Sequence, residues 1–140
     1  MFRRRRELPA DLRAAEHAFH AVLDLVEPAK AGLADVLPTT RMPGRPFGHA
    51  LAEFVQRLEG AKHAMLAWQD GALQGSREAC DAGLLEALDR AHRISSEGAE
   101  VEGFEALLGL VESLLDPLEP FADAELAFRD RRRGRRVRSD

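Results

Sequence analysis

Arginine clusters at both ends of the chain carry the strongest chemical signal in the sequence. The first cluster comprises Arg3, Arg4, Arg5 and Arg6, and the second comprises Arg131, Arg132, Arg133, Arg135, Arg136 and Arg138. Guanidinium groups at this density can bind a nucleic-acid backbone through release of phosphate counterions. They are equally typical of a helix C-terminus, whose dipole favours cations, followed by a solubilising tail. Only Phe2 and Phe128 flank the clusters, so base stacking on interleaved aromatic rings is not expected.

The charge layout limits where an anion would bind. Residues 7–128 contain nine Arg or Lys against 22 Asp or Glu, whereas residues 129–140 contain seven Arg against two Asp. An acidic body repels nucleic acid everywhere except at the two basic ends. We therefore expect an external anion or an acidic partner at these ends. Attachment to a membrane surface is less favoured, because the arginines are terminal rather than spread along one helix face.

Histidines and carboxylates recur at spacings that suit metal ligands on helices. These are His17 and His20 with Asp24, His49 with Glu53, Glu59 with His63, and Asp89 with His92. Most of them share a face with polar residues and should point to solvent, while His92 leans toward the core through Leu85 and Leu88. Neither the paired histidines of hemerythrins nor the Glu-x-x-His motif of di-iron bundles occurs. No metal or other cofactor is predicted.

Nucleophilic catalysis finds little support in the sequence. Cys80 falls on the apolar face of a predicted helix, where burial raises a thiol's pKa. The chain contains no nucleophile elbow, P-loop or dinucleotide fingerprint. We therefore do not predict an enzyme.

The stretch from Pro38 to Gly48 is the longest irregular segment and the second candidate site. Its candidate residues are Arg41, Met42, Arg45 and Phe47. The two apolar side chains could contact a partner and the two arginines could hold an anion. Alternatively, Phe47 covers the end of the core and the prolines stiffen a surface crossing. We expect the two arginines to pair with an acidic turn that contains Glu97, Glu100 and Glu102.

Composition and periodicity predict the elements that position these residues. The 140-residue chain is 45% hydrophobic, lacks Tyr and is rich in helix formers. Apolar residues at three and four spacing indicate a first helix of about 27 residues that ends before Pro38, with Pro28 inside it. Further helices are predicted from about Phe47 to Gln69, after Ser76 to about Ile94, and from Phe104 through Phe128.

We predict an all-α fold, an antiparallel up-down-up-down four-helix bundle with proline-kinked first and fourth helices. The expected organisation is a basic arm at 1–7, the bundle at 8–128 and a basic tail at 129–140. A three-helix core with one docked helix and a dimer that completes its bundle between chains are the alternatives. Because the fourth helix would be about 50 Å long against about 40 Å for the first, its last turns should project past the bundle and carry Phe128 with the arginines.

These patterns favour a small non-enzymatic interaction or scaffold module in the cytoplasm. Its partner would be another protein or a second copy, bound through leucines off the main apolar stripes, unless these widen the core: Leu23, Leu25, Leu66, Leu73, Leu85 and Leu110. One alternative is a nucleic-acid-binding accessory protein that uses the arginine ends. The other is a bundle that binds a small molecule or a metal between kinked helices. No apolar run reaches the roughly 18 residues that span a bilayer.

Overall fold

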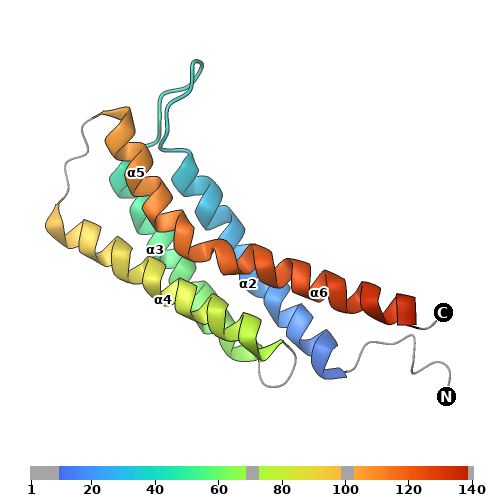
Figure 1. The fold of residues 1–140 in the computed structure, drawn as a ribbon. Helices are drawn as coiled ribbons and strands as arrows, with labels where there is room; N and C mark the ends of the chain where they lie inside the picture. The colour runs from blue at the N-terminus through green and yellow to red at the C-terminus, as the bar shows by residue number, and fades with distance from the viewer. Residues whose placement is uncertain (1–9, 69–72, 99–102, 139–140) are drawn as a thin grey trace.

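The fold is a bundle of α-helices. The computed structural model describes residues 10–68, 73–98 and 103–138, and these parts contain helices and loops but no strand. In chain order the helices are α2 (Ala10–Ala34), α3 (Phe47–Ala64), the 3-10 turn η1 (Met65–Ala67), α4 (Gln74–Glu97), α5 (Phe104–Leu115), the 3-10 turn η2 (Asp116–Leu118) and α6 (Glu119–Arg138) (Figure 1). The predicted all-α bundle is confirmed.

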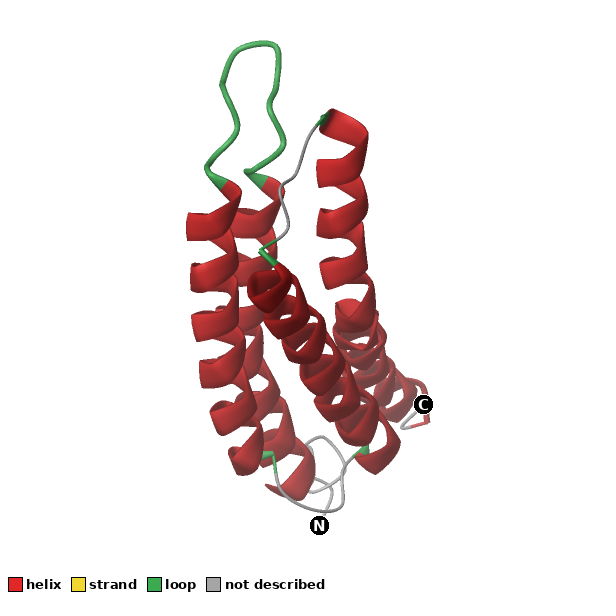
Figure 2. Cartoon of the chain, turned by 90° about the vertical axis from the view of Figure 1, so that its left-hand side faces the viewer, coloured by secondary structure: helices red, strands yellow, loops and turns green. Residues whose placement is uncertain are grey.

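Helices α2 and α3 form an antiparallel hairpin, and its loop extends beyond the ends of both helices (Figure 2). Helix α4 packs on α3, while α6 packs on α4. The helices bury most of the apolar stripes that their periodicity predicts, but Phe104 at the start of α5 is 51% exposed. The main buried side chains are Leu12, Phe19, Val22, Val26 and Leu33 of α2, Leu51, Phe54 and Leu58 of α3, Cys80, Leu84, Ala87 and Ala91 of α4, Val111 and Leu114 of α5, and Phe121, Ala124 and Phe128 of α6.

The predicted fourth helix is divided into two. Proline lacks a backbone N–H, so Pro117 cannot donate to the Ser113 carbonyl in the i to i−4 pattern of an α-helix. One 3-10 turn, η2, replaces the α-helical ladder at this point. Helix α6 then leaves in a different direction from α5 (Figure 1). The whole of α6 consequently lies across the bundle rather than extending α5.

A glycine in α4 allows η2 to approach closely. A Cβ atom built on Gly83 would lie 2.1 Å from the carbonyl oxygen of Pro117, far inside van der Waals contact. Gly83 is fully buried against this turn. The absence of a side chain at this position therefore sets how closely α4 and η2 pack.

The start of α4 differs from the prediction. The helix begins at Gln74, and Leu73 precedes it with a left-handed backbone (φ 55°); the expected start after Ser76 is three residues too late. Arg77, in the first turn, donates from Nε to the carbonyl oxygen of Trp68 at the end of η1. This bond connects the start of α4 to the end of η1, so the Arg77 side chain stabilises the junction between the two segments.

Candidate protein-interaction surface on α3 and α4

An apolar groove lies between the beginning of α3 and the end of α4. It encloses about 650 Å³. Its wall from α3 consists of Phe47, Gly48, Leu51, Ala52 and Val55, and its wall from α4 consists of His92, Ile94, Ser95 and Gly98. Leu51 also belongs to the buried core, and Phe47, Val55 and Ile94 pack against that core. The groove is therefore an open extension of the hydrophobic core.

Two exposed leucines lie farther along the same pair of helices, one just past the end of α3 and one midway along α4. Leu66 of η1 is 61% exposed and Leu85 of α4 is 46% exposed. Glu59 of α3 and His92 of α4 approach to 3.8 Å and lie at the same level of the antiparallel pair. Leu66 follows Glu59 by seven residues and Leu85 precedes His92 by seven, so the helical repeat places each leucine on the same face as that pair.

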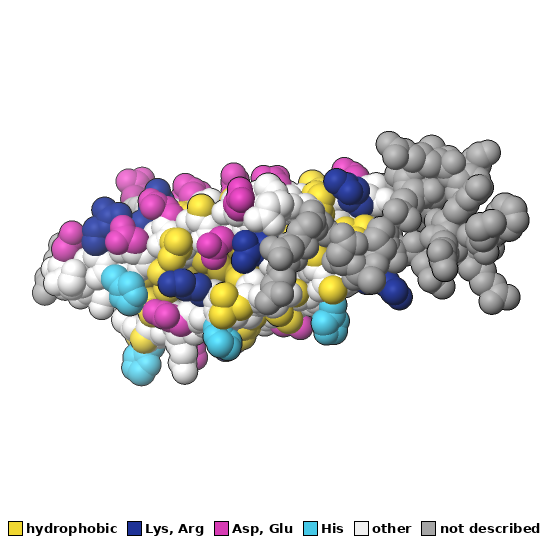
Figure 3. Space-filling view, turned by 90° about the horizontal axis from the view of Figure 1, so that it is seen from below, with side chains coloured by type: hydrophobic (Ala, Val, Ile, Leu, Met, Phe, Trp, Pro, Cys, Tyr) yellow, Lys and Arg dark blue, Asp and Glu magenta, His cyan; other side chains and the backbone are white. Residues whose placement is uncertain are grey.

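Together the groove, the Glu59–His92 pair and the two leucines form one continuous region, which we call the α3/α4 surface. Seen from below, hydrophobic side chains lie open to solvent on this side of the molecule, between charged residues and next to several histidines (Figure 3). Lys62 of α3 and the Asp89–Arg93 ion pair of α4 are exposed on or beside this region. An apolar centre with a polar rim is the usual composition of a protein interface.

His92 was predicted to lean toward the core, and this prediction is wrong. Its side chain is 60% exposed and faces Glu59 across the helix pair. Leu85, which suggested a buried face, is itself exposed. The buried stripe of α4 runs through Cys80, Leu84 and Ala91, and the His92 face lies to one side of it.

The candidate residues of the loop between α2 and α3 differ in their partners and in their exposure. Arg45 donates from Nη2 to Glu53 Oε2 at 2.5 Å, and this hydrogen bond holds the pKa of the Glu53 carboxyl below its usual value. Pairing of Arg45 with the acidic turn near Glu97 was expected, and the structure corrects it. Arg41 is exposed, and Met42 is 67% exposed. Phe47 is half-buried and lines the groove, which combines the two roles considered for it.

Thr39 shapes the tip of this loop. Its Oγ1 accepts hydrogen bonds from the backbone N–H groups of Arg41, at 3.3 Å, and Met42, at 3.0 Å. Its own backbone N–H donates to the Met42 carbonyl at 2.9 Å. The turn holds Met42 away from the groove end of α3, so the loop tip and the α3/α4 surface are separate features.

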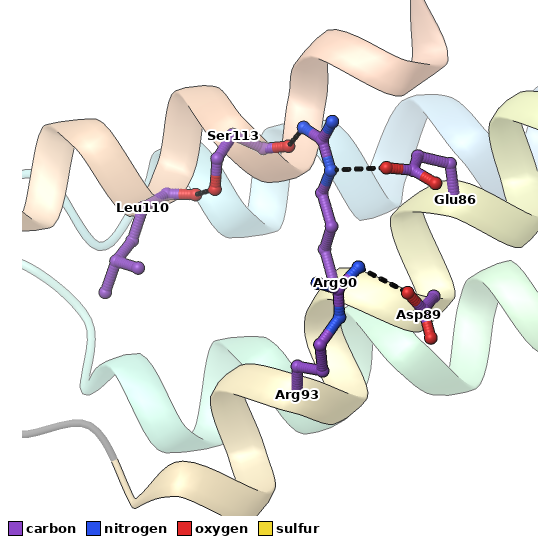
Figure 4. A network of polar contacts seen from close by, with 6 residues as sticks. All are labelled: Glu86, Asp89, Arg90, Arg93, Leu110 and Ser113. Carbon is purple, nitrogen blue, oxygen red and sulfur yellow. Dashed lines mark hydrogen bonds and ion pairs between the residues drawn. The ribbon is translucent and has the colours of Figure 1, made fainter.

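An arginine of α4 compensates for the interruption at Pro117. Arg90 donates from Nη1 to the Ser113 carbonyl at 2.6 Å and from Nε to Glu86 Oε1 at 2.9 Å (Figure 4). The Ser113 hydroxyl donates to the Leu110 carbonyl at 2.8 Å. Because Pro117 cannot supply the helical donor for Ser113, Arg90 satisfies an otherwise orphaned carbonyl. Sequence analysis missed this role. The carbonyl itself could have been identified, because it belongs to the residue four positions before Pro117.

The position of Phe128 corrects one part of the prediction of a projecting helix end. The Phe128 side chain is only 2% exposed. Its ring centroid lies 5.1 Å from that of Phe19 and 5.5 Å from that of Trp68. Phe128 therefore belongs to an aromatic cluster in the core and is not available to a partner, because α6 crosses α2 after the bend at η2 (Figure 1).

One arginine of the C-terminal cluster has an intramolecular partner. Arg132 Nη2 lies 2.6 Å from Glu16 Oε2 of α2; this oxygen has no partner in full hydrogen-bond geometry, so the contact is an ion pair. Arg131 is exposed. Arg3–Arg6 lie outside the described residues, as do the side chains of Arg133, Arg135, Arg136 and Arg138. Helix α6 continues through this basic stretch to Arg138.

The remaining chemical candidates are structural or exposed. Cys80 is buried as predicted, and burial, with smaller contributions from Asp123 and Asp81, raises its thiol pKa from 9.0 to about 12. His17, His20 and Asp24 are exposed on α2, as their spacing predicted. Within the described parts of the chain, no three His, Cys, Asp or Glu side chains converge as metal ligands would.

No protein-family model, curated protein or solved structure matches this chain. Among the helices of the described residues, none combines the length and apolar character needed to cross a membrane.

Proposed function

We propose that the chain is a small, non-enzymatic protein-interaction module that binds through its α3/α4 surface. The observation that carries this proposal is the pairing of exposed Leu66 and Leu85 with an apolar groove on the same two helices. Burying one leucine side chain contributes about 1.5–3 kcal/mol. Covering a surface that exposes such side chains would therefore contribute favourably to the free energy of binding a partner.

The surroundings of the α3/α4 surface support a protein partner over a small molecule. The groove is an open trough rather than an enclosed cavity. Drug-sized ligands are usually enclosed over most of their surface. The buried thiol of Cys80 also cannot reach a bound substrate, which agrees with a role in binding.

A matched set of leucine substitutions tests this proposal. The double variant Leu66→Ser and Leu85→Ser removes the apolar contacts, while Leu126→Ser changes a leucine of α6 that is 50% exposed but lies off this surface. Each protein is used as bait in extracts of the native host. We expect a protein retained by the wild type and by Leu126→Ser to be lost from the double variant. Equal retention by all three baits would refute the proposal.

The basic end of α6 supports a second candidate function, binding of nucleic acid. Helix α6 continues ten residues past the buried Phe128, and this extension contains seven arginines. If nucleic acid binds through its phosphates, the logarithm of the association constant should fall linearly with the logarithm of the salt concentration. Filter binding with duplex RNA and DNA tests it, using the full chain and a chain without residues 1–6 and 130–140. Weak binding that the deletion leaves unchanged would exclude this candidate.

A further inference from the structure

We propose that the occupant of the α3/α4 surface is the same surface of a second copy, so that the chain forms a two-fold symmetric dimer. The proposal rests on the function proposed above and names its partner. The symmetry axis crosses α3 between Glu59 and Lys62 and crosses α4 between Asp89 and His92. Each helix then lies against the same helix of the second copy, in reverse direction.

The shape of the surface favours this arrangement. The exposed Leu66 and Leu85 lie on one side of the Glu59–His92 pair, and the groove lies on its other side. Along α3, Leu66 and Val55 lie at nearly equal distances on either side of the axis, each about 8 Å away at the helical rise. The two-fold rotation therefore places the protruding leucines of each copy over the groove of the other.

The charges of the surface are self-complementary in the same arrangement. Reversal of α3 brings Glu59 of one copy opposite Lys62 of the other, and both residues are exposed. Reversal of α4 brings Asp89 opposite His92 and close to Arg93. On α3 the facing residues Glu59 and Lys62 carry unlike charges, which steers encounter toward this register. The alternative axis, parallel to the helices, would stack leucines on leucines and leave both grooves open.

The size of the surface predicts a dimer that dissociates. Helix α3 with η1 comprises 21 residues, about 30 Å of helix, and two helices side by side are about 20 Å wide. The area covered is thus roughly 600 Å² per copy. Counted over both copies, the buried area lies at the lower limit for specific interfaces, and complexes of this size are weak and transient. We therefore expect monomer and dimer to exchange at micromolar to submillimolar concentrations.

Disulfide trapping with the full chain tests the dimer and its geometry. The double variant Val55→Cys and Leu66→Cys is oxidised mildly, and products are separated on non-reducing gels. Within one copy these positions are about 16 Å apart along the helix, too far for a disulfide. Between copies the proposed axis makes them neighbours. We expect covalent dimers from the double variant and none from either single variant; Cys80, being buried, does not compete.

Either of two other outcomes would overturn the inference, and the two can be distinguished. Covalent dimers from Leu66→Cys alone would show that the leucine ends meet each other, which contradicts the axis. No covalent dimer, together with monomeric sedimentation of the wild type at several hundred micromolar, would show that no second copy binds. In that case the interaction function still stands if the leucine double variant loses a host protein, and falls if it does not. Thermal melting of every variant checks that it folds.

Discussion

The aromatic cluster at the start of α2 predicts a large effect of Phe128→Ala. The Phe128 ring is 2% exposed and contacts Phe19 and Trp68 with centroid distances of 5.1 and 5.5 Å. Buried Phe→Ala changes cost about 3–5 kcal/mol, because both transfer free energy and packing are lost. The cluster lies near the end of the bundle, where α6 can move to fill part of the cavity. We therefore expect the lower limit, about 3 kcal/mol, and a fall in Tm on the order of 10 °C.

Thermal and urea unfolding monitored by circular dichroism measure this change. Leu126→Ala is the matched control, since it lies two residues away on α6 and is half exposed; its effect should stay within about 0.5 kcal/mol. Amide hydrogen exchange gives a local readout, and backbone amides of residues 125–132 should exchange faster in Phe128→Ala. If Phe128→Ala is no more destabilising than Leu126→Ala, the end of α6 is not packed on α2 and our description of the cluster is wrong.

Three further predictions follow from the packing of α4. Gly83→Ala should destabilise the fold by about 2 kcal/mol despite alanine's helix propensity, since its Cβ would meet the η2 backbone at 2.1 Å; a neutral or stabilising result in urea unfolding would contradict the close approach. Arg90→Met leaves the Ser113 carbonyl without its donor and should cost about 1–2 kcal/mol, against at most about 0.5 kcal/mol for Arg93→Met, whose ion pair is exposed; equal effects would refute the compensating role. Because the Cys80 thiol pKa is raised on folding, stability should be unaffected below pH 9.0 and should fall as pH rises toward about 12; Cys80→Ala should remove this component of the pH dependence, and identical pH profiles would show that the thiol is not buried.

Periodicity predicted the helices well where the apolar stripe was uninterrupted. The stripe from Leu12 to Val36 corresponds to α2 and its first following turn, and Pro28 lies within that continuous helix. The fourth segment failed because the effect of Pro117 depends on its surroundings. A single proline is compatible with a kinked helix or with a complete change of direction, and only the packing of η2 on Gly83 decides between them.

The burial of Phe128 shows a second limit of sequence patterns. Phe121, Ala124 and Phe128 keep the three and four spacing and are all buried. Alanine is a weak hydrophobic marker among charged neighbours, so the continuation of the buried stripe to Phe128 is hard to see in the sequence. The predicted overhang placed Phe128 on the projecting turns of a kinked helix, whereas the structure packs its ring against Phe19 and Trp68.

The candidate surface could be predicted only in part. Leu66 and Leu85 were identified as leucines off the main stripes, and Phe47 was identified as a candidate contact. Whether these residues lie near one another depends on the register of α3 against α4, in which Glu59 lies beside His92. A local sequence pattern does not contain this register. Leu23 was grouped with the same leucines but is buried. Whether such a residue widens the core or faces a partner is decided by the neighbouring helix, not by its own.

Sedimentation equilibrium tests the proposal of a self-associating interaction surface most directly. The wild type, the Leu66→Ser and Leu85→Ser double variant, and Leu126→Ser are compared from about 5 to 500 micromolar, the range expected for an interface of this size. We predict reversible dimerisation of the wild type and of Leu126→Ser, with loss of at least tenfold in association constant for the double variant. A wild type that stays monomeric throughout, or a dimer that the double variant forms equally well, would contradict it.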